Sequence, residues 1–275
     1  MLNDLFRLDG KVIIITGATG LLGREHAYAI AKYGGTPILL DLSKEAVNSL
    51  ADDLNREYKT GAMGFSVDIT NESQIQKNTE FLIKKFQKID GLVNNAANNP
   101  KVESSNKVNF SRLENFSLDA WQNDIAVGLT GAFLCAKYYG AKIAKNTNGG
   151  VIINIASDLG LIAPDQGLYR EDNVPDELQN VKPVTYSVVK SGLIGLTRYL
   201  ATYWPEKNVR CNALCPGGIE NGQPEEFLNE VSKRIPMKRL AQSNEYQSTL
   251  LWMLSESSSY LNGAIVPVDG GRTTW

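Results

Sequence analysis

The amino-acid sequence predicts an α/β fold, with one doubly wound parallel sheet of about seven strands and helices on both of its faces. Apolar runs alternate with amphipathic helical stretches along all 275 residues, which is the pattern of such sheets. A glycine-rich turn directly follows the first apolar run and opens a helix, as in the first strand-turn-helix unit of many parallel sheets. No linker or repeat interrupts the alternation, so we expect a single domain over residues 1–275.

The composition is that of an ordinary globular protein. The net charge is −2 and 43% of the residues are hydrophobic; no basic block predicts nucleic-acid binding, and no apolar run is long enough to cross a membrane. The first residues carry Asp4 and Asp9 and no apolar signal core, so we expect a cytoplasmic protein. His26 is the only histidine, and the cysteines suggest neither a metal site nor a disulfide framework. We therefore expect no metal, no disulfide with the third cysteine, Cys135, and buried thiols at Cys211 and Cys215.

The first predicted strand, Lys11 to Thr16, is a continuous apolar run of the kind that is buried on both faces of a sheet. Gly17, Gly20 and Gly23 follow it in TGATGLLG, before a helical pattern. Strand, glycine turn and helix in this order can hold a pyrophosphate, because the backbone can approach closely and the helix N-terminus presents free N–H groups. The alternative is a tight turn with no ligand.

The second strand, Thr36 to Leu40, ends in Asp41. A carboxylate at this distance from the glycine turn accepts hydrogen bonds from adenosine ribose hydroxyls and repels a 2′-phosphate. No basic residue stands at Ala18, Thr19 or Leu42, so NAD is favoured over NADP. Asp41 could also merely cap the next helix.

Polar residues end the following strands, where ligands collect in open parallel sheets. Asp68 is expected to accept a hydrogen bond from the adenine amino group, and Asn94 and Asn95 lie at the carboxyl end of a fourth strand. The long polar loop from Asn98 to Phe116 is expected to be functional. The remaining expected elements are helices at Lys44–Lys59, Asn71–Lys88, Leu118–Lys145, Pro224–Lys233 and Asn244–Ser255, a helix from Thr185 onward, and strands at Met63–Val67, Gly91–Ala97, Val151–Ile155, Val209–Leu214 and Ala264–Val268. The helix from Leu118 is expected to turn Trp121, Ile125, Phe133 and Ala136 inward.

Tyr186 and Lys190 lie four residues apart on a predicted helix, so their side chains can share one pocket. An ammonium at about 4 Å favours the phenolate by about 4 kcal/mol at an effective dielectric of about 20, which would let the tyrosine exchange a proton near pH 7. Ser157 ends the fifth strand and could hydrogen-bond the same substrate. The four-residue spacing alone is also consistent with an exposed helix face, on which Tyr186 and Lys190 would have no catalytic role.

Taken in order, TGATGLLG, Asp41, NNAA at 94–97, Ser157, YSVVK at 186–190 and PGG at 216–218 resemble the short-chain dehydrogenase/reductase family along nearly the whole chain. The resemblance implies a Rossmann-type subunit of a homotetramer or homodimer that moves hydride between a nicotinamide and a hydroxyl or carbonyl carbon. It also implies that Tyr186 is the general acid/base, that Lys190 lowers the pKa of Tyr186 and holds the nicotinamide ribose, and that Ser157 binds the substrate oxygen.

The cofactor residues that the glycine turn, the strand ends and the resemblance together imply are Gly17, Thr19, Gly20, Leu22, Gly23, Asp41, Leu42, Asp68, Ile69, Asn95, Ala96, Ala97, Tyr186, Lys190, Pro216, Gly217 and Ile219.

The chain departs from the family pattern at several positions. Its glycine spacing is that of extended, nucleotide-sugar-modifying relatives, but too few residues follow Lys190 for their larger C-terminal domain, so we expect the short form. Gly128 stands where the family has an asparagine that supports a water next to the lysine, and a second water could fill the space. Ile219, Glu220 and Asn221 stand where the family often has a threonine that binds the carboxamide group of the nicotinamide.

The segment between Ser157 and Tyr186 is longer than in the family, so residues 165–182 are expected to loop out beside the active site as a lid. The insertion is rich in polar residues, which favours a polar sugar or nucleotide-sugar substrate; the alternative is a surface or subunit-contact loop. With this insertion, Gly128 and PGGIENGQPEEF at 216–227, the chain resembles oxidoreductases of bacterial flagellin and surface-polysaccharide sugar pathways. A non-catalytic NAD sensor or scaffold and an NAD-retaining epimerase or dehydratase remain open. The polar residues of the insertion are Gln166, Tyr169, Arg170, Glu171, Asp172, Asn173, Asp176 and Glu177.

Overall fold

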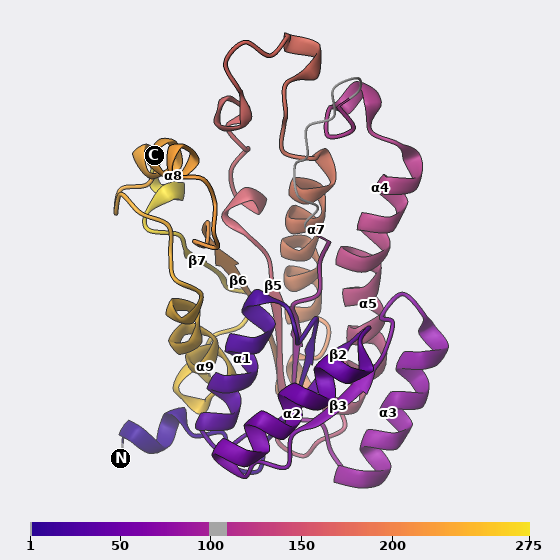
Figure 1. Cartoon of the computed structure of the whole chain (residues 1–275). Helices are drawn as coiled ribbons and strands as arrows, with labels where there is room; N and C mark the ends of the chain where they lie inside the picture. Colours follow the sequence, from indigo (N-terminus) through magenta and orange to yellow (C-terminus); the bar gives the residue numbers. More distant parts are fainter. Residues whose placement is uncertain (1, 99–108) are drawn as a thin grey trace.

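The structure is a computed structural model, and it describes residues 2–98 and 109–275. Among these residues, seven parallel strands form one sheet in the order β3-β2-β1-β4-β5-β6-β7, which confirms the predicted fold class (Figure 1). The strands are β1 Val12–Thr16, β2 Thr36–Asp41, β3 Met63–Ser66, β4 Gly91–Asn94, β5 Gly150–Ile155, β6 Val209–Pro216 and β7 Ile265–Val268. The strand order reverses between β1 and β4, and ligands bind at such a reversal.

Helices cover both faces of this sheet, as the alternating pattern predicts. Side-chain caps fix three of the helix starts: Ser43 accepts a hydrogen bond from the third residue beyond it, and Asn71 and Ser117 do the same. The helices are α1 Leu21–Lys32, α2 Lys44–Tyr58, α3 Glu72–Phe86, α4 Leu118–Ile125, α5 Gly131–Cys135, α6 Ala141–Ile143, α7 Val184–Ala201, α8 Glu225–Lys233 and α9 Gln247–Leu254. No helix among the described residues is long and apolar enough to cross a membrane.

Successive residues of the central strands point to opposite faces and so build two cores. Ile13 and Ile15 of β1 pack on one side with residues of α1, α2 and α9. Val12 and Ile14 pack on the other side with residues of α3, α5 and α7. Cys135, Cys211 and Cys215 are free thiols, as expected from the sequence, and all three are buried. The double-sided core holds the carboxyl ends of the strands in fixed positions, and the site is built at those ends.

The long helix predicted from Leu118 is interrupted by two turns of π-helix, at Ala126–Thr130 and Ala136–Gly140. Each π turn holds an extra residue and changes which side chains face the sheet. Phe133 is therefore 50% exposed in the single chain, whereas Leu134 and Ala136 are buried. The prediction that Phe133 points inward is wrong because it assumed an unbroken period of 3.6 residues.

The burial of His26 should make the free energy of unfolding depend on pH. Its side chain is fully buried in α1, neither ring nitrogen has a partner among the described residues, and burial lowers its pKa to about 3. In the unfolded chain the pKa of a histidine is about 6.5. Between pH values of about 3 and about 6.5, His26 therefore binds a proton in the unfolded chain and none in the folded chain. The free energy of unfolding should therefore fall as the pH drops below about 6.5, by up to about 1.4 kcal/mol per pH unit from this residue.

We expect His26→Leu to lose that share of the acid sensitivity, because leucine fills a similar volume without a titrating group. Urea unfolding at pH 7.5, 6 and 5 measures it as the difference in pH slope between the two proteins. Equal slopes would show that the ring is protonated or solvated in the folded chain.

Candidate functional site

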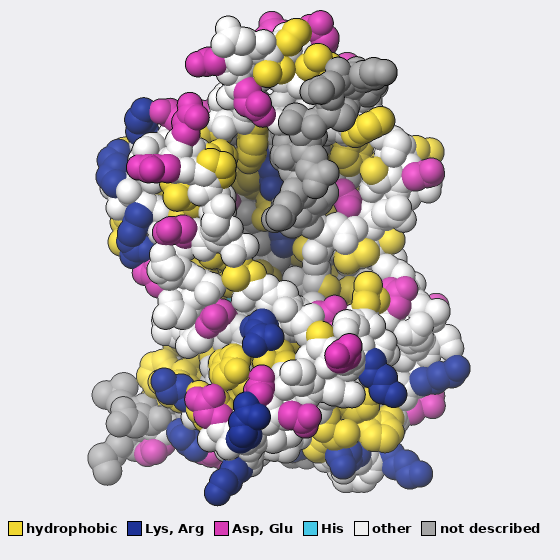
Figure 2. Space-filling model, in the orientation of Figure 1, with side chains coloured by type: hydrophobic (Ala, Val, Ile, Leu, Met, Phe, Trp, Pro, Cys, Tyr) yellow, Lys and Arg dark blue, Asp and Glu magenta, His cyan; other side chains and the backbone are white. Residues whose placement is uncertain are grey.

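A cleft of about 680 Å³ lies at the carboxyl ends of the central strands, and Figure 2 shows this part of the molecule hollowed, with basic side chains visible inside. Its lining runs from the glycine turn through the ends of β2, β4, β5 and β6 to α7 and α8. All of the site residues predicted from the sequence line this one cleft except Gly23. The fold therefore brings the glycine turn, Tyr186 and Lys190 together in one cleft.

The glycine turn leaves no room for side chains at two of its positions. A Cβ on Gly23 would lie 2.1 Å from the Gly17 carbonyl oxygen, and one on Gly17 would lie 2.9 Å from the Ala96 Cα. Gly17 also has a φ of +62°, which favours glycine. Gly23 does not line the cleft and lets α1 pack on the turn, and its contact with a ligand stays a prediction. Such a close backbone approach is what a pyrophosphate cradle requires.

Asp41 joins the end of β2 to the glycine turn. Its Oδ2 accepts hydrogen bonds from the Thr19 backbone N–H at 2.9 Å and from the Thr19 Oγ1 at 2.6 Å, and its Oδ1 accepts from the Leu42 N–H at 2.8 Å. The carboxylate lines the cleft and is held in one orientation by these contacts. The sequence does not signal that Thr19 positions Asp41, because the two residues belong to different strand-helix units.

Of three other polar residues at the ends of strands, two line the cleft and one does not. Asp68 lines the cleft, with its Oδ1 accepting from both the N–H and the hydroxyl of Thr70. Asn95 lines it too and donates from Nδ2 to the carbonyl oxygens of Thr16 and Gly17, each at 3.0 Å. Asn94 instead lies under α5, where its Nδ2 donates to the Asn154 Oδ1 at 2.8 Å and to the Ala132 carbonyl at 3.4 Å. A residue on the opposite face of the same strand cannot reach the ligand side.

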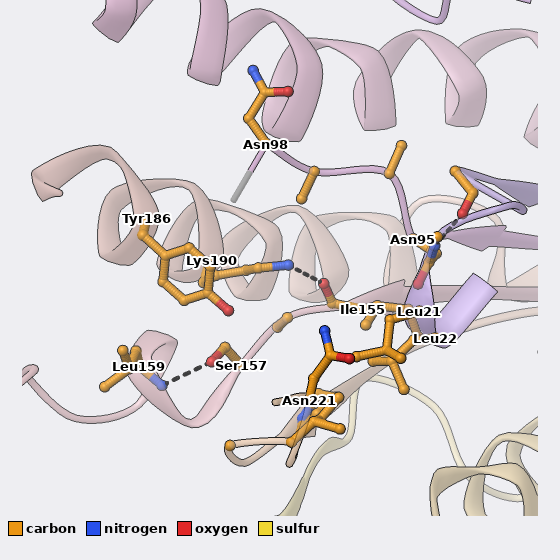
Figure 3. Close-up of a pocket in the computed structure, with 18 of the residues that line it drawn as sticks. Leu21, Leu22, Asn95, Asn98, Ile155, Ser157, Leu159, Tyr186, Lys190 and Asn221 are labelled. Atoms are coloured by element: carbon orange, nitrogen blue, oxygen red, sulfur yellow. Dashed lines mark hydrogen bonds between the residues drawn. The ribbon is translucent and has the colours of Figure 1, made fainter. Parts of the chain in front are cut away.

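Tyr186 and Lys190 project from one face of α7 toward the segment that follows β5 (Figure 3). The Lys190 Nζ donates to the Ile155 carbonyl at 2.8 Å and lies 5.7 Å from the centroid of the Tyr186 ring. Ser157 faces the same space; its hydroxyl donates to the Asp158 Oδ1 at 2.8 Å and accepts from the Leu159 N–H at 3.2 Å. The three side chains predicted to work together converge in the cleft, while Asn98 points away from them.

Burial has the largest effect on the pKa values of Tyr186 and Lys190. It raises the pKa of Tyr186, although a hydrogen bond with Ser157 acts in the opposite direction, and it lowers the pKa of Lys190 to about 8. The expectation that Lys190 depresses the pKa of Tyr186 in the chain alone is therefore wrong. The loss of water on burial costs the phenolate more than its hydrogen bond with Ser157 returns.

A buried ion pair next to Ser157 was not foreseen from the sequence. The Arg272 Nη1 lies 2.9 Å from the Asp158 Oδ2, and the two side chains are 11% and 4% exposed. Asp158 therefore links the Ser157 hydroxyl to the C-terminal turn at Arg272–Thr274. An arginine after the last strand gives no sequence signal for a partner so far away along the chain.

Gly128 packs against α7, since a Cβ on it would lie 2.5 Å from the Val189 Cγ1. Val189 thus takes up much of the space that the glycine leaves. A cavity of about 10 Å³ remains, lined by Asp124, Gly128, Tyr186 and Lys190 among others, and this is about the room that one water needs. The Asp124 carboxylate accepts from Thr185 at 2.5 Å and from Asn98 at 3.1 Å.

The insertion at 165–182 packs on α8 beside the cleft. Leu168 forms an apolar cluster with Val231, Ile235 and Leu240, which we call the cover cluster, and the Tyr169 ring lies 6.0 Å from that of Phe227. Of the insertion, Leu168, Tyr169 and Lys182 line the cleft. Its acidic residues Asp165, Glu171, Asp172, Asp176 and Glu177 are instead exposed to solvent. The predicted loop from Asn98 to Phe116 falls largely outside the described residues.

Comparison with known proteins agrees with this geometry. A family model described as short chain dehydrogenase matches residues 11–169, and one described as Enoyl-(Acyl carrier protein) reductase matches residues 176–273. The chain is 31% identical to an uncharacterized oxidoreductase of Thermotoga maritima, with 96% of this chain and 98% of that protein covered. It is also 31% identical to an NADP-dependent mannitol dehydrogenase of Hypocrea jecorina, with 99% and 96% covered.

Among solved structures, a gluconate 5-dehydrogenase of Burkholderia cenocepacia in complex with NADP and tartrate superposes with a TM-score of 0.85 at 25% identity, with 100% of both chains covered. The fold, the cleft and the sequence matches agree over nearly the whole length. The chain belongs to the short-chain dehydrogenase/reductase family and is an oxidoreductase that acts on CH–OH groups with a nicotinamide dinucleotide.

Proposed function

We propose that the protein transfers hydride between NAD and a secondary alcohol or ketone of a polar, hydroxyl-rich substrate such as a sugar, sugar acid or nucleotide sugar. The observation that carries the proposal is the convergence of Ser157, Tyr186 and Lys190 in the cleft that also contains the glycine turn and Asp41. Relatives named for mannitol and gluconate support a polyhydroxylated substrate.

The cleft fits a dinucleotide, because Gly17 and Gly20 line it without side chains and lead into the N-terminus of α1. Gly17 and Gly20 would hold the pyrophosphate, Asp41 the adenosine ribose, and Asp68 the adenine amino group. Lys190 would hold the nicotinamide ribose. When bound, the oxidised nicotinamide supplies the hydride acceptor and a positive charge. The remaining residues that would contact it are Thr19, Leu22, Leu42, Ile69, Asn95, Ala96, Ala97, Tyr186, Pro216, Gly217 and Ile219.

In this proposal Tyr186 takes the hydroxyl proton of an alcohol during oxidation and returns it to the carbonyl oxygen during reduction. Ser157 holds the same oxygen, and Asp158, fixed by Arg272, keeps the Ser157 hydroxyl in place. Burial raises the pKa of Tyr186 in the chain alone, and the positive charge of an oxidised nicotinamide would act in the opposite direction. Proton exchange by Tyr186 is thereby tied to the presence of the cofactor.

We assign NAD rather than NADP, because the fixed Asp41 carboxylate would face a 2′-phosphate at the adenosine end. The insertion and α8 together act as a lid, and the whole chain works as one domain in a homodimer or homotetramer. The cover cluster and the Tyr169 contact with Phe227 support the lid, because they join both segments over the cleft.

A panel of polyols, sugar acids and nucleotide sugars, tested with NAD and NADP side by side, checks this function. We expect reduced cofactor to accumulate with at least one polar substrate, faster with NAD. Turnover of apolar alcohols alone would overturn the substrate class, and faster turnover with NADP would overturn the role of Asp41. No hydride transfer with any alcohol would favour a non-catalytic NAD sensor, and cofactor that stays bound through purification without net reduction would favour an epimerase or dehydratase.

A further inference from the structure

An arginine from the last turn of the chain reaches the substrate end of the cleft. Arg272 begins the C-terminal turn and lines the cleft together with Ser157 and Tyr186. Its Nη1 donates to the Asp158 Oδ2 at 2.9 Å, and the Asp158 Oδ1 accepts from the Ser157 hydroxyl at 2.8 Å. A single carboxylate therefore joins the guanidinium to the hydroxyl that is expected to bind the reacting oxygen.

Most of the hydrogen-bond donors of Arg272 remain available to a ligand. A guanidinium has five N–H groups in one plane, and Asp158 accepts from Nη1. In the described part of the chain, Asp158 is the only hydrogen-bond partner of this guanidinium, and no nitrogen of it is buried without a partner. Because the side chain is 11% exposed and lines the cleft, we expect the remaining N–H groups to face the cleft.

The charge of Arg272 is largely balanced by that of Asp158. Both side chains of this ion pair are almost completely buried, so the two opposite charges act on each other at close range with little water between them. A carboxylate or phosphate would meet Asp158 as well as Arg272 and would gain little net attraction from the pair. A hydroxyl oxygen is not repelled in this way, and a hydrogen bond that it accepts from a charged donor is stronger than a neutral one.

The phenol of Tyr169 lies close to the same ion pair. Tyr169 also lines the cleft; burial raises its pKa, and the nearby charges of Arg272 and Asp158 act on that pKa in opposite directions. A phenol, a guanidinium and a carboxylate thus meet at one wall of the cleft, and together they contain both donors and acceptors. Such a wall suits a ligand with hydroxyl groups on successive carbons.

We propose that Arg272 donates hydrogen bonds to a hydroxyl group of the substrate beyond the carbon that is oxidised or reduced, and so selects polyhydroxylated substrates over simple alcohols. The inference rests on the proposed function, because Ser157 and Tyr186 must hold the reacting oxygen for Arg272 to face the rest of the carbon chain. A simple alcohol displaces water from the cleft and leaves these N–H groups without a partner, which costs binding free energy.

Substrates with one carbon skeleton and different numbers of hydroxyl groups test this inference. One set contains butan-2-ol, butane-2,3-diol and erythritol, and another contains pentan-2-ol, pentane-2,3-diol and xylitol, all assayed with NAD. We expect Arg272→Met to lower kcat/KM for the polyol about tenfold or more beyond its loss for the least hydroxylated member that reacts, chiefly through KM. Equal losses for all reactive members, confined to kcat, would overturn the inference and leave the proposed function intact, because Arg272 would then act only through Asp158 and Ser157.

Two further variants separate direct binding from an effect on Ser157. Arg272→Lys keeps a positive charge for Asp158 but loses the planar fork of donors, so we expect it to restore kcat more fully than the preference for the polyol. Arg56→Met removes an arginine from an exposed ion pair with Asp53, away from the cleft. It is the matched control and should leave kcat and the preference unchanged. If Arg272→Met fails to fold, Arg272→Lys serves for the same comparison of substrates.

Binding to the complex with reduced cofactor tests Arg272 without turnover. NADH cannot accept a hydride, so erythritol and xylitol bind to the protein–NADH complex without reacting, and calorimetric titration measures their Kd. Arg272→Met should weaken this binding about tenfold or more, and Arg56→Met should not change it. The same Kd in Arg272→Met as in the unchanged protein, or no binding of either polyol to the unchanged protein, would overturn the inference.

Erythronate, which has a carboxylate on the skeleton of erythritol, distinguishes a hydroxyl contact from an anion contact in the same titration. We expect Arg272→Met to weaken its binding no more than that of erythritol. A larger loss for erythronate would overturn the assignment to a hydroxyl group. Polyol binding that depends on Arg272, together with no hydride transfer to NAD from any substrate, would count against the proposed function and support the contact with Arg272.

Discussion

Replacement of Tyr186 by phenylalanine should reduce turnover by about a hundred- to ten-thousandfold, the range that a positioned acid/base contributes, while NAD still binds. The variant keeps the aromatic ring, whose centroid lies 5.7 Å from the Lys190 ammonium, and removes only the hydroxyl that faces Ser157 (Figure 3). The loss should therefore appear in kcat, with the affinity for NAD little changed.

Steady-state kinetics and a titration of NAD measure the two quantities separately. Tyr199→Phe is the matched control, because it removes a tyrosine hydroxyl from the same helix at a side chain that is 61% exposed. Retention of more than about a tenth of the original rate in Tyr186→Phe would remove this residue from the acid/base role.

Replacement of Gly23 by alanine should abolish NAD binding and destabilise the fold by about 1–3 kcal/mol, the usual cost of overpacking. The added Cβ would lie 2.1 Å from the Gly17 carbonyl and 2.8 Å from the Ala18 Cα. Both contacts are backbone, so the glycine turn itself must move, and with it the N–H groups that would hold the pyrophosphate.

Calorimetric titration with NAD and urea unfolding measure the two effects. Gly195→Ala introduces the same methyl group on α7, where nothing lies within 4 Å, and should leave NAD affinity unchanged. A Gly23→Ala protein that binds NAD with its original affinity would show that the turn accommodates a side chain, and that the cradle does not depend on the close approach.

The fold could be predicted from the sequence because its signals are local. Apolar runs, glycine turns and helix caps each specify one element, and right-handed connections leave few ways to assemble them. The same locality explains why Tyr186 and Lys190 could be paired in advance, since both lie on one helix face.

What the sequence did not predict depends on contacts between distant segments. Arg272 reaches Asp158 from the last turn of the chain, and Thr19 holds Asp41 from a neighbouring unit; neither pairing has a characteristic spacing. Phe133 was misplaced because the π turns change the helical phase, and nothing in the residue pattern marks a π turn. The pKa of Tyr186 was misjudged because a sequence gives the nearest charge but not the depth of burial.

The cover cluster has a kinetic consequence. Leu168 of the insertion and Val231 of α8 share one apolar contact, so the two walls of the entrance cannot separate without exposing that surface to water. We therefore expect the insertion and α8 to move together if the entrance widens, and the apolar area that they share opposes that movement.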